Sequence, residues 1–221
     1  MDFIPALSRA FAENASATNA GAMAKYMKGL FPFYGLKTDV RRALTKDLLV
    51  QYKDEVSGNA RQIALELYRK PQREYHYTAI EIVTKQLKNK FVTEDIALIE
   101  TLLVTHAWWD SVDTIAKYLL GGYLQQFPEQ IPTVIKRFSD SDNMWLNRSV
   151  ILFQLGYKKA TNVDLLFVEC KKHSHSKEFF IQKAIGWALR EHAKTDPDVV
   201  RNFVATANLK PLSTREALKN I

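Results

Sequence analysis

Cysteine, glycine and proline are all scarce in this sequence of 221 residues. The single cysteine, Cys170, excludes an intrachain disulfide framework. Eight glycines and seven prolines leave long stretches without a residue that breaks helices. Charged residues interrupt every apolar run before the ~18 residues that a membrane helix needs, so we expect no membrane-spanning segment. Because the first residues form neither a basic leader nor a long apolar stretch, we expect a cytoplasmic protein.

Apolar residues recur at steps of three and four along most of the chain, which is the spacing of amphipathic helices. In residues 95–104, for example, Ile99, Leu102 and Leu103 fall on one face. No alternating strand pattern competes with this spacing, and no low-complexity tract or long linker marks a boundary. The sequence therefore predicts an all-α fold in a single domain of residues 1–221.

A triplet of a variable, a small and an aliphatic residue returns every 35 residues. The triplets begin at Thr78, Asp113, Arg148 and Lys183, and Arg42 extends the series backwards with a spacing of 36. This period is typical of helix pairs stacked in a solenoid, in which equivalent positions line one surface. The five leading residues would then form a basic row with one carboxylate in its middle. The alternative is chance, because small–aliphatic pairs are common in amphipathic helices.

Two tryptophans fall at helical spacing from charged residues of this row. Trp109 lies four residues before Asp113, so an indole and a carboxylate share one helix face and could contact one ligand. The alternative is that Trp109 belongs to the core and Asp113 is a solvated or capping residue. Trp187 lies in a stripe with Lys183, Arg190 and Lys194, which favours stacking on a nucleic-acid base. Its alternative is a rim position with lysine stems packed on the indole.

Glycine at position 186, beside Trp187, removes a side chain where something could approach closely, which we interpret as room for a base to stack. Arg148 lies in an apolar neighbourhood, where an unpaired guanidinium is costly. It therefore needs an anionic partner, either a phosphate or a carboxylate of a neighbouring repeat such as Asp113.

Near the N-terminus, residues 37–42 resemble a helix start that is capped by a threonine and followed by two arginines. Lys37, Thr38, Arg41 and Arg42 are therefore candidates for a phosphate cradle, and solvated charge is the alternative. The net charge of +7 agrees with a polyanionic partner but is well short of histone-like values.

Other common sites find little support in the sequence. Cys170, His173 and His175 match no standard spacing of metal ligands, so we expect no metal site. Glycine-rich phosphate loops, GxSxG elbows and HExxH motifs are absent from the chain. This excludes the commonest nucleotide-binding, hydrolase and zinc-protease classes.

Several stretches resemble the AlkD family of bacterial DNA alkylation-repair glycosylases. The most specific are WWDSVD at residues 108–113 and KEFFIQKAIGWALRE, which begins at residue 177. Shorter ones lie at residues 24–28, 35–38 and 142–146, so the resemblance runs from about residue 23 to residue 216. It implies an all-α, HEAT-like helical repeat solenoid whose concave basic face binds duplex DNA. It also implies the excision of bases of the 3-methyladenine and 7-methylguanine type.

The resemblance assigns roles to individual residues. The catalytic aspartate of the family falls on Asp113, its cleft tryptophans on Trp109 and Trp187, and its cleft arginine on Arg148. DNA contacts fall on the following residues: Tyr26, Lys37, Thr38 and Arg42. The family often has proline after that threonine, whereas this chain has Asp39 and so a negative charge near the expected phosphate.

These assignments lead to a prediction of function and two alternatives. Taken together, the stripe, the helix start and the resemblance predict a monomeric base-excision enzyme without metal or organic cofactor, associated with the bacterial nucleoid during repair. Its predicted DNA contacts are Tyr26, Lys37, Thr38, Arg41, Arg42, Lys183, Arg190 and Lys194. One alternative is a non-catalytic HEAT-repeat reader of distorted or branched DNA, and the other is a scaffold for an acidic protein.

Overall fold

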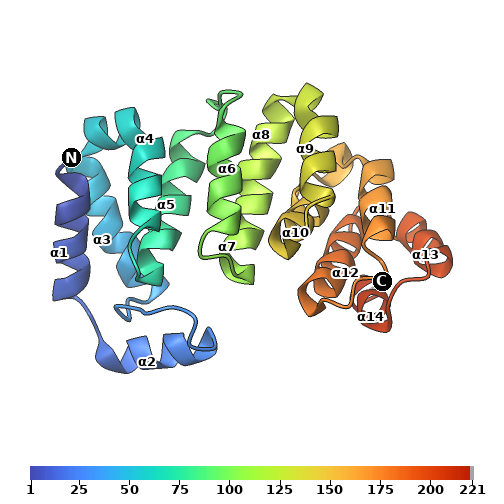
Figure 1. Ribbon diagram of the computed structural model, residues 1–221, viewed down its shortest axis with the longest axis horizontal. Helices are drawn as coiled ribbons and strands as arrows, with labels where there is room; N and C mark the ends of the chain where they lie inside the picture. Colours follow the sequence, from blue (N-terminus) through green and yellow to red (C-terminus); the bar gives the residue numbers. More distant parts are fainter. Residues whose placement is uncertain (220–221) are drawn as a thin grey trace. The chain divides into compact units, whose positions relative to one another are not determined.

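The computed structural model describes residues 1–219, which form helices and loops without a strand (Figure 1). The prediction of an all-α fold is therefore confirmed. The chain divides into two compact units, Met1–Lys90 (unit 1) and Phe91–Ile221 (unit 2). None of the described helices is long and apolar enough to cross a membrane.

Unit 1 is built around the apolar faces of its helices. Phe3, Leu7 and Phe11 recur at every fourth position of α1 and are fully buried. They pack against α3 and α4, and α4 in turn pairs with α5. Figure 1 shows α2 lying across the other helices of this unit at one end. The helices of unit 1 are α1 (Phe3–Glu13), α2 (Ala17–Tyr26), α3 (Thr38–Gln51), α4 (Lys53–Tyr68) and α5 (Arg73–Gln86).

Unit 2 begins with α6 (Asp95–Val104) and continues with a helix that changes its winding. Residues 109–126 run without a break through α7 (Trp109–Thr114), the π-helical segment η1 (Ile115–Leu120) and α8 (Gly121–Gln126). A π-helical turn widens a helix by one residue per turn and is frequent near functional sites. Asp113 lies in the last turn before this widening.

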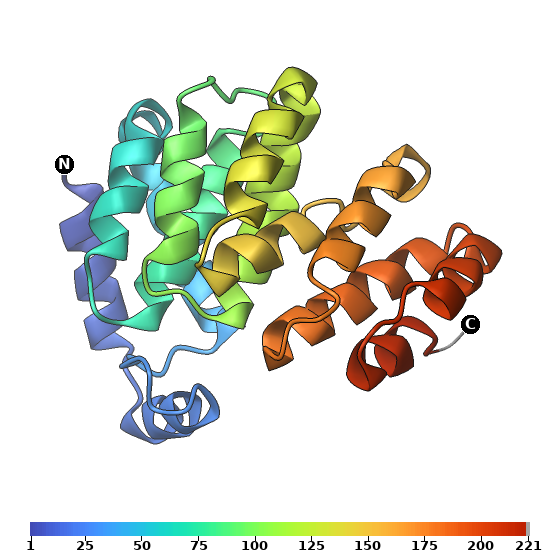
Figure 2. The ribbon, with the colours of Figure 1, turned by 45° about the vertical axis from the view of Figure 1, so that its right-hand side comes forward.

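Four of the remaining elements of unit 2 have a proline at their first or second residue, where a missing N–H costs no helical hydrogen bond. Pro128 opens a short 3-10 turn and Pro197 is the first residue of a helix. Figure 2 shows these C-terminal helices from the side. They are η2 (Pro128–Gln130), α9 (Ile131–Ser139), α10 (Met144–Leu152), η3 (Lys158–Ala160), α11 (Val163–Lys172), α12 (Phe179–Ala193), α13 (Pro197–Thr206) and α14 (Pro211–Ala217).

The 35-residue period corresponds to the helices of the fold. Its five leading residues lie on α3, α5, α7, α10 and α12, in that order. Their exposure differs from the prediction of a surface row, because Thr78 and Arg148 are buried. Thr78 accepts a hydrogen bond from Arg41, and Arg148 donates to Asp113. Part of the predicted row is therefore buried, because its side chains form hydrogen bonds with residues of a neighbouring repeat.

Candidate active site

A buried ion pair joins two helices of unit 2. The Nε of Arg148 on α10 donates to Oδ1 of Asp113 on α7 at 2.7 Å, and its Nη2 donates to Oδ2 at 2.9 Å. Only 5% of the arginine side chain and 13% of the aspartate side chain are exposed. A carboxylate of the neighbouring repeat, one of the two anionic partners predicted for Arg148, is therefore present. The fork of the guanidinium matches the carboxylate in a bidentate pair.

Arg148 also reaches a third helix. Its Nη1 donates to the main-chain carbonyl of Phe180 on α12, and its guanidinium lies 5.9 Å from the centre of the Phe180 ring. The three contacts hold the guanidinium in one orientation. Asp113 is therefore positioned by a side chain that is itself attached to α12.

Burial raises the pKa of Asp113 above the usual value of an aspartate, and repulsion from Asp110 acts in the same direction. The hydrogen bonds and the charge of Arg148 oppose this shift. Because arginine stays protonated in proteins, the carboxylate always faces a cation. The arrangement suits a group that stabilises positive charge at a site largely closed to water.

Three aromatic side chains pack against one another, and one of them, Phe180, contacts Arg148. The ring of Trp108 lies 5.0 Å from that of Phe180 and 5.7 Å from that of Trp145, and the last two are 5.2 Å apart. None of these three residues was predicted as part of the site. The spacing of 35 residues between Trp145 and Phe180 matches the repeat and could have identified these two residues, whereas Trp108 lies 37 residues before Trp145. The cluster forms an apolar wall, and Phe180 brings this wall into contact with Arg148.

Trp109 is the first residue of α7 and is partly buried. One helical turn separates it from Asp113, so the two residues share a face of α7 as the spacing predicts. The nearby Trp108 precedes the helix with an extended backbone, at φ −155° and ψ 160°. The two neighbouring tryptophans therefore have different surroundings, with Trp108 in the aromatic wall and Trp109 on the helix.

Trp187 on α12 packs partly against the core of unit 2. Its cationic neighbours have carboxylate partners, because Lys183 and Arg190 both bind Glu216 of α14, at 3.0 and 2.9 Å. A Cβ on Gly186 would lie 2.4 Å from the Cβ of Glu216. The close approach that the glycine predicts is therefore made by α14.

Lys194 follows the last residue of α12 and pairs with Glu191 at 2.5 Å. Eleven residues separate it from Lys183, which corresponds to about 16 Å along a helix. The four residues of the predicted cationic stripe thus extend over most of α12.

In unit 1, the predicted helix cap differs from the observed one. Helix α3 begins at Thr38, its N-cap residue is Lys37, and no side chain makes a cap hydrogen bond. The prediction of a threonine cap is therefore wrong by one position, because the chain enters the helix immediately after Lys37. Both residues are exposed, as is Asp39 in the first turn.

The two arginines of this helix start have different surroundings. Arg41 is 3% exposed and binds both carboxylate oxygens of Glu81 at 2.8 Å, which gives it a structural role in unit 1. We therefore do not propose Arg41 as a phosphate contact, because its side chain is buried and already paired. The side chain of Arg42 is 64% exposed and shares Glu81 at 2.9 Å. Tyr26, the last residue of α2, is 68% exposed and borders a hollow of about 270 Å³.

Cys170, His173 and His175, the residues considered for a metal site, take no part in the ion pair of Asp113 and Arg148. Cys170 is fully buried, and burial raises the pKa of its thiol. The Nε2 of His173 lies 3.0 Å from the hydroxyl of Ser139, while His175 is exposed. Among the described residues, no group of three or more potential ligands could hold a metal ion.

Comparisons with known proteins agree on one family. The family model described as DNA alkylation repair enzyme matches residues 7–221. A solved structure described as a predicted DNA alkylation repair enzyme from Enterococcus faecalis is 34% identical in sequence, with a TM-score of 0.85. The match covers 94% of this chain and 96% of that one. The search of curated proteins gave no match.

Proposed function

The chain belongs to the DNA alkylation repair enzyme family, and on this premise we propose that it hydrolyses the N-glycosidic bond of cationic alkylated bases in duplex DNA. The substrates would be of the 3-methyladenine and 7-methylguanine type. The observation that carries the proposal is the mostly buried carboxylate of Asp113. This carboxylate is paired with Arg148 and lies on the same face of α7 as Trp109. We also propose that the protein is a monomer, that it forms one repeat domain, and that it needs no metal or organic cofactor.

A single carboxylate is sufficient if the base is already cationic. Glycosidases ordinarily need a second carboxyl group to protonate the leaving group. Alkylation at N3 or N7 replaces that proton. As the C1′–N bond breaks, the base leaves with the bonding electrons and becomes neutral, while water adds to C1′. Asp113 stabilises the positive charge that develops on the sugar and accepts the proton of the attacking water.

The electrostatic contribution is large enough for a bond that alkylation has already weakened. Opposite unit charges 4 Å apart attract by about 4 kcal/mol at an effective dielectric constant of 20, which corresponds to roughly a thousandfold in rate. Trp109 and Trp187 would contact the sugar and backbone beside the lesion. Each favourable contact between a cation and an indole adds roughly 0.5 to 2 kcal/mol.

The proposed roles of the cations depend on their surroundings. Arg148 is a positioning residue for Asp113, because its carboxylate partner takes up two of its nitrogens. Exposed Lys37, Thr38 and Arg42 would contact phosphates, and Tyr26 would border them. Lys183, Arg190 and Lys194 would reach DNA only by exchanging their carboxylate partners for phosphate.

The decisive experiment measures the release of free 7-methylguanine from duplex DNA. We expect Asp113→Asn to slow release by about a thousandfold and to keep most of the affinity for DNA, because only the charge acting on the sugar is lost. Asp110→Asn is the matched control, since it removes a carboxylate from the same helix one turn away, and it should keep most of the activity. Equal release by Asp113→Asn and the wild type would refute the mechanism.

One observation favours a second function, a non-catalytic reader of distorted DNA. Both carboxylate oxygens of Asp113 are hydrogen-bonded to Arg148, which partly neutralises the charge that catalysis requires. Tight binding of lesion-containing duplex without any release of base would establish the reader.

A further inference from the structure

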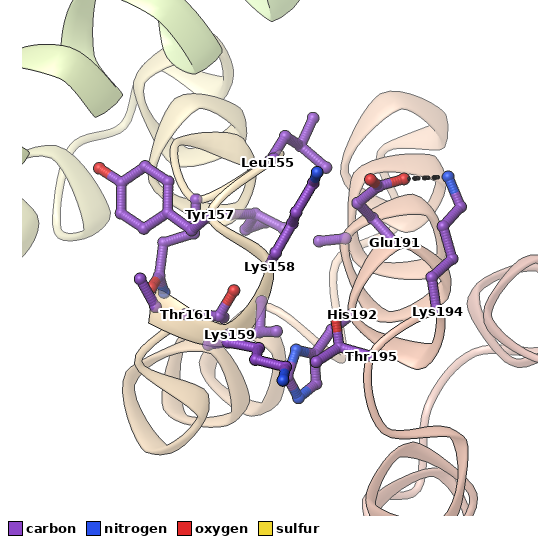
Figure 3. Close-up of a pocket in the computed structure, with 15 residues that line it drawn as sticks. Leu155, Tyr157, Lys158, Lys159, Thr161, Glu191, His192, Lys194 and Thr195 are labelled. Carbon is purple, nitrogen blue, oxygen red and sulfur yellow. Dashed lines mark hydrogen bonds and ion pairs between the residues drawn. The ribbon is translucent and has the colours of Figure 1, made fainter.

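A cavity lies at the C-terminal ends of α10 and α12, two of the helices that contribute to the candidate active site. Its volume is about 680 Å³, within the usual range for small-molecule sites. It is enclosed by the end of α10, the η3 loop, α11 and the end of α12 (Figure 3). Phe180 precedes His192 by twelve residues of α12, which corresponds to about 18 Å along the helix.

Hydrogen bonds within the protein fix the walls of the cavity. The side-chain amide of Gln154 donates to the carbonyl of Asn162 at 3.1 Å, and its oxygen accepts from the Asn162 amide at 2.7 Å. These two bonds close the loop between α10 and α11. The hydroxyl of Tyr157 donates to the carbonyl of Gly121 at 2.6 Å and so attaches this loop to α8. A preformed site loses less entropy when it binds a ligand.

His192 lines this cavity and has no hydrogen-bond partner among the described residues. The residue is 7% exposed. Burial lowers the pKa of His192, so the ring is neutral near pH 7 and offers one donor and one acceptor. A buried polar group without partners typically costs about 1–3 kcal/mol. Both nitrogens are inaccessible in the structure and lie on opposite sides of the ring, so a ligand would have to turn the ring toward the cavity and would then pair with one of them.

The remaining lining defines the rest of the ligand. Lys158 and Lys159 line the cavity from the η3 loop, across from α12 (Figure 3). Within residues 1–219, neither lysine has a carboxylate partner, and Glu191 at the rim already pairs with Lys194. Ile151, Leu155, Leu166 and Ala188 supply an aliphatic wall. The cavity thus combines positive charge, an apolar surface and one histidine ring without a hydrogen-bond partner among the described residues.

We propose that this cavity binds a nucleoside monophosphate, with the phosphate at Lys158 and Lys159, the base against the aliphatic wall and the base edge at His192. A phosphate monoester of this kind can be a free nucleotide or the phosphorylated end of a DNA strand. The site is separate from the ion pair of Asp113, and its existence does not depend on the proposed glycosylase activity.

Calorimetric titration of the full chain with deoxyadenosine 5′-monophosphate tests the proposal. We expect saturable binding, and affinities at least tenfold lower for deoxyadenosine and for inorganic phosphate alone. The Lys158→Gln/Lys159→Gln variant should bind at least tenfold more weakly. Lys171→Gln/Lys219→Gln, which removes the same charge outside the cavity, should bind like the wild type. Absence of saturable binding at millimolar nucleotide, or equal losses in the two variants, would overturn the proposal.

His192→Leu provides a readout that a purely structural role would not give. The variant should unfold at a higher temperature, because two unpaired nitrogens are replaced by carbon, and it should bind the nucleotide at least tenfold more weakly. An unchanged affinity would contradict the assignment of His192. Displacement of the nucleotide by a 5′-phosphorylated dinucleotide, and failure of its unphosphorylated form, would identify strand ends as the source. If neither dinucleotide displaces the nucleotide, the free nucleotide is the ligand. Both results support the proposed site.

Discussion

Asp113 and Arg148 each make the burial of the other tolerable. A buried ion pair is an uncertain source of stability, because both charges lose their hydration, but the loss of one partner leaves the other buried and unpaired. Arg148 has further contacts with the carbonyl and ring of Phe180. The carboxylate proposed to act on the sugar is therefore kept in place by three helices and not by its own helix alone.

Replacement of the arginine should affect folding as well as activity. We expect Arg148→Ala to lower the free energy of unfolding by about 3–5 kcal/mol, because the Asp113 carboxylate would stay buried without a counter-charge. It should also slow base release. Urea denaturation monitored by circular dichroism gives the first quantity.

The double variant Asp113→Asn/Arg148→Gln is the control for this interpretation. It replaces the ion pair by neutral hydrogen-bonding groups, so it should recover much of the lost stability and none of the activity. An Arg148→Ala protein as stable as the wild type would mean that Asp113 finds water or another partner.

At the scale of elements, the contact between α12 and α14 depends on a glycine. The space for a Cβ at Gly186 is taken by Glu216 and by the carbonyl of Ser213, at 2.4 and 2.9 Å. We expect Gly186→Ala to destabilise unit 2 by roughly 1–3 kcal/mol, because α14 must shift. Gly21→Ala is the matched control, since a Cβ on this helical glycine meets nothing within 4 Å. It should stabilise the protein by up to about 1 kcal/mol, and thermal unfolding compares the two.

The same contact predicts a dependence of stability on pH. Hydrogen bonds from Lys183 and Arg190 lower the pKa of Glu216 to about 2. A carboxyl group with a lowered pKa in the folded state stabilises that state above its unfolded pKa, and the contribution disappears as the pH falls. We therefore expect the unfolding free energy of the wild type to fall more steeply than that of Glu216→Gln between about pH 4.5 and pH 2. Parallel curves for the two proteins would show that the pairs do not stabilise the fold.

At the scale of the whole molecule, charge and chemistry are divided between the two units. Residues 1–90 contain 15 of the 31 basic residues and 9 of the 24 acidic ones, so unit 1 carries +6 of the net charge of +7. Unit 2 carries only +1 but contains the buried ion pair and both candidate tryptophans. Attraction to DNA would thus be strongest at unit 1, and the proposed chemistry belongs to unit 2.

This division predicts how duplex binding responds to salt. The affinity should fall steeply with salt, and Lys37→Gln/Arg42→Gln should reduce the slope of log affinity against log salt by about 1.8, as expected for two lost phosphate contacts. Lys88→Gln/Lys90→Gln removes the same charge from unit 1 at residues not proposed as contacts and should change the slope less. Equal slopes for both variants would point to diffuse attraction. Failure of duplex DNA to bind at all would favour the scaffold for an acidic protein.

The sequence by itself determined the helical class, the 35-residue period and the family, because apolar spacing and specific motifs are local properties of the chain. It also predicted that Arg148 needs an anion and that something approaches Gly186 closely. Only the tertiary structure decided which groups meet these needs, namely Asp113 and helix α14. It also showed that Arg41 and Thr78 are buried and that Trp108, Trp145 and Phe180 form one wall. Partners from different repeats are tens of residues apart in the chain, and only packing brings them together.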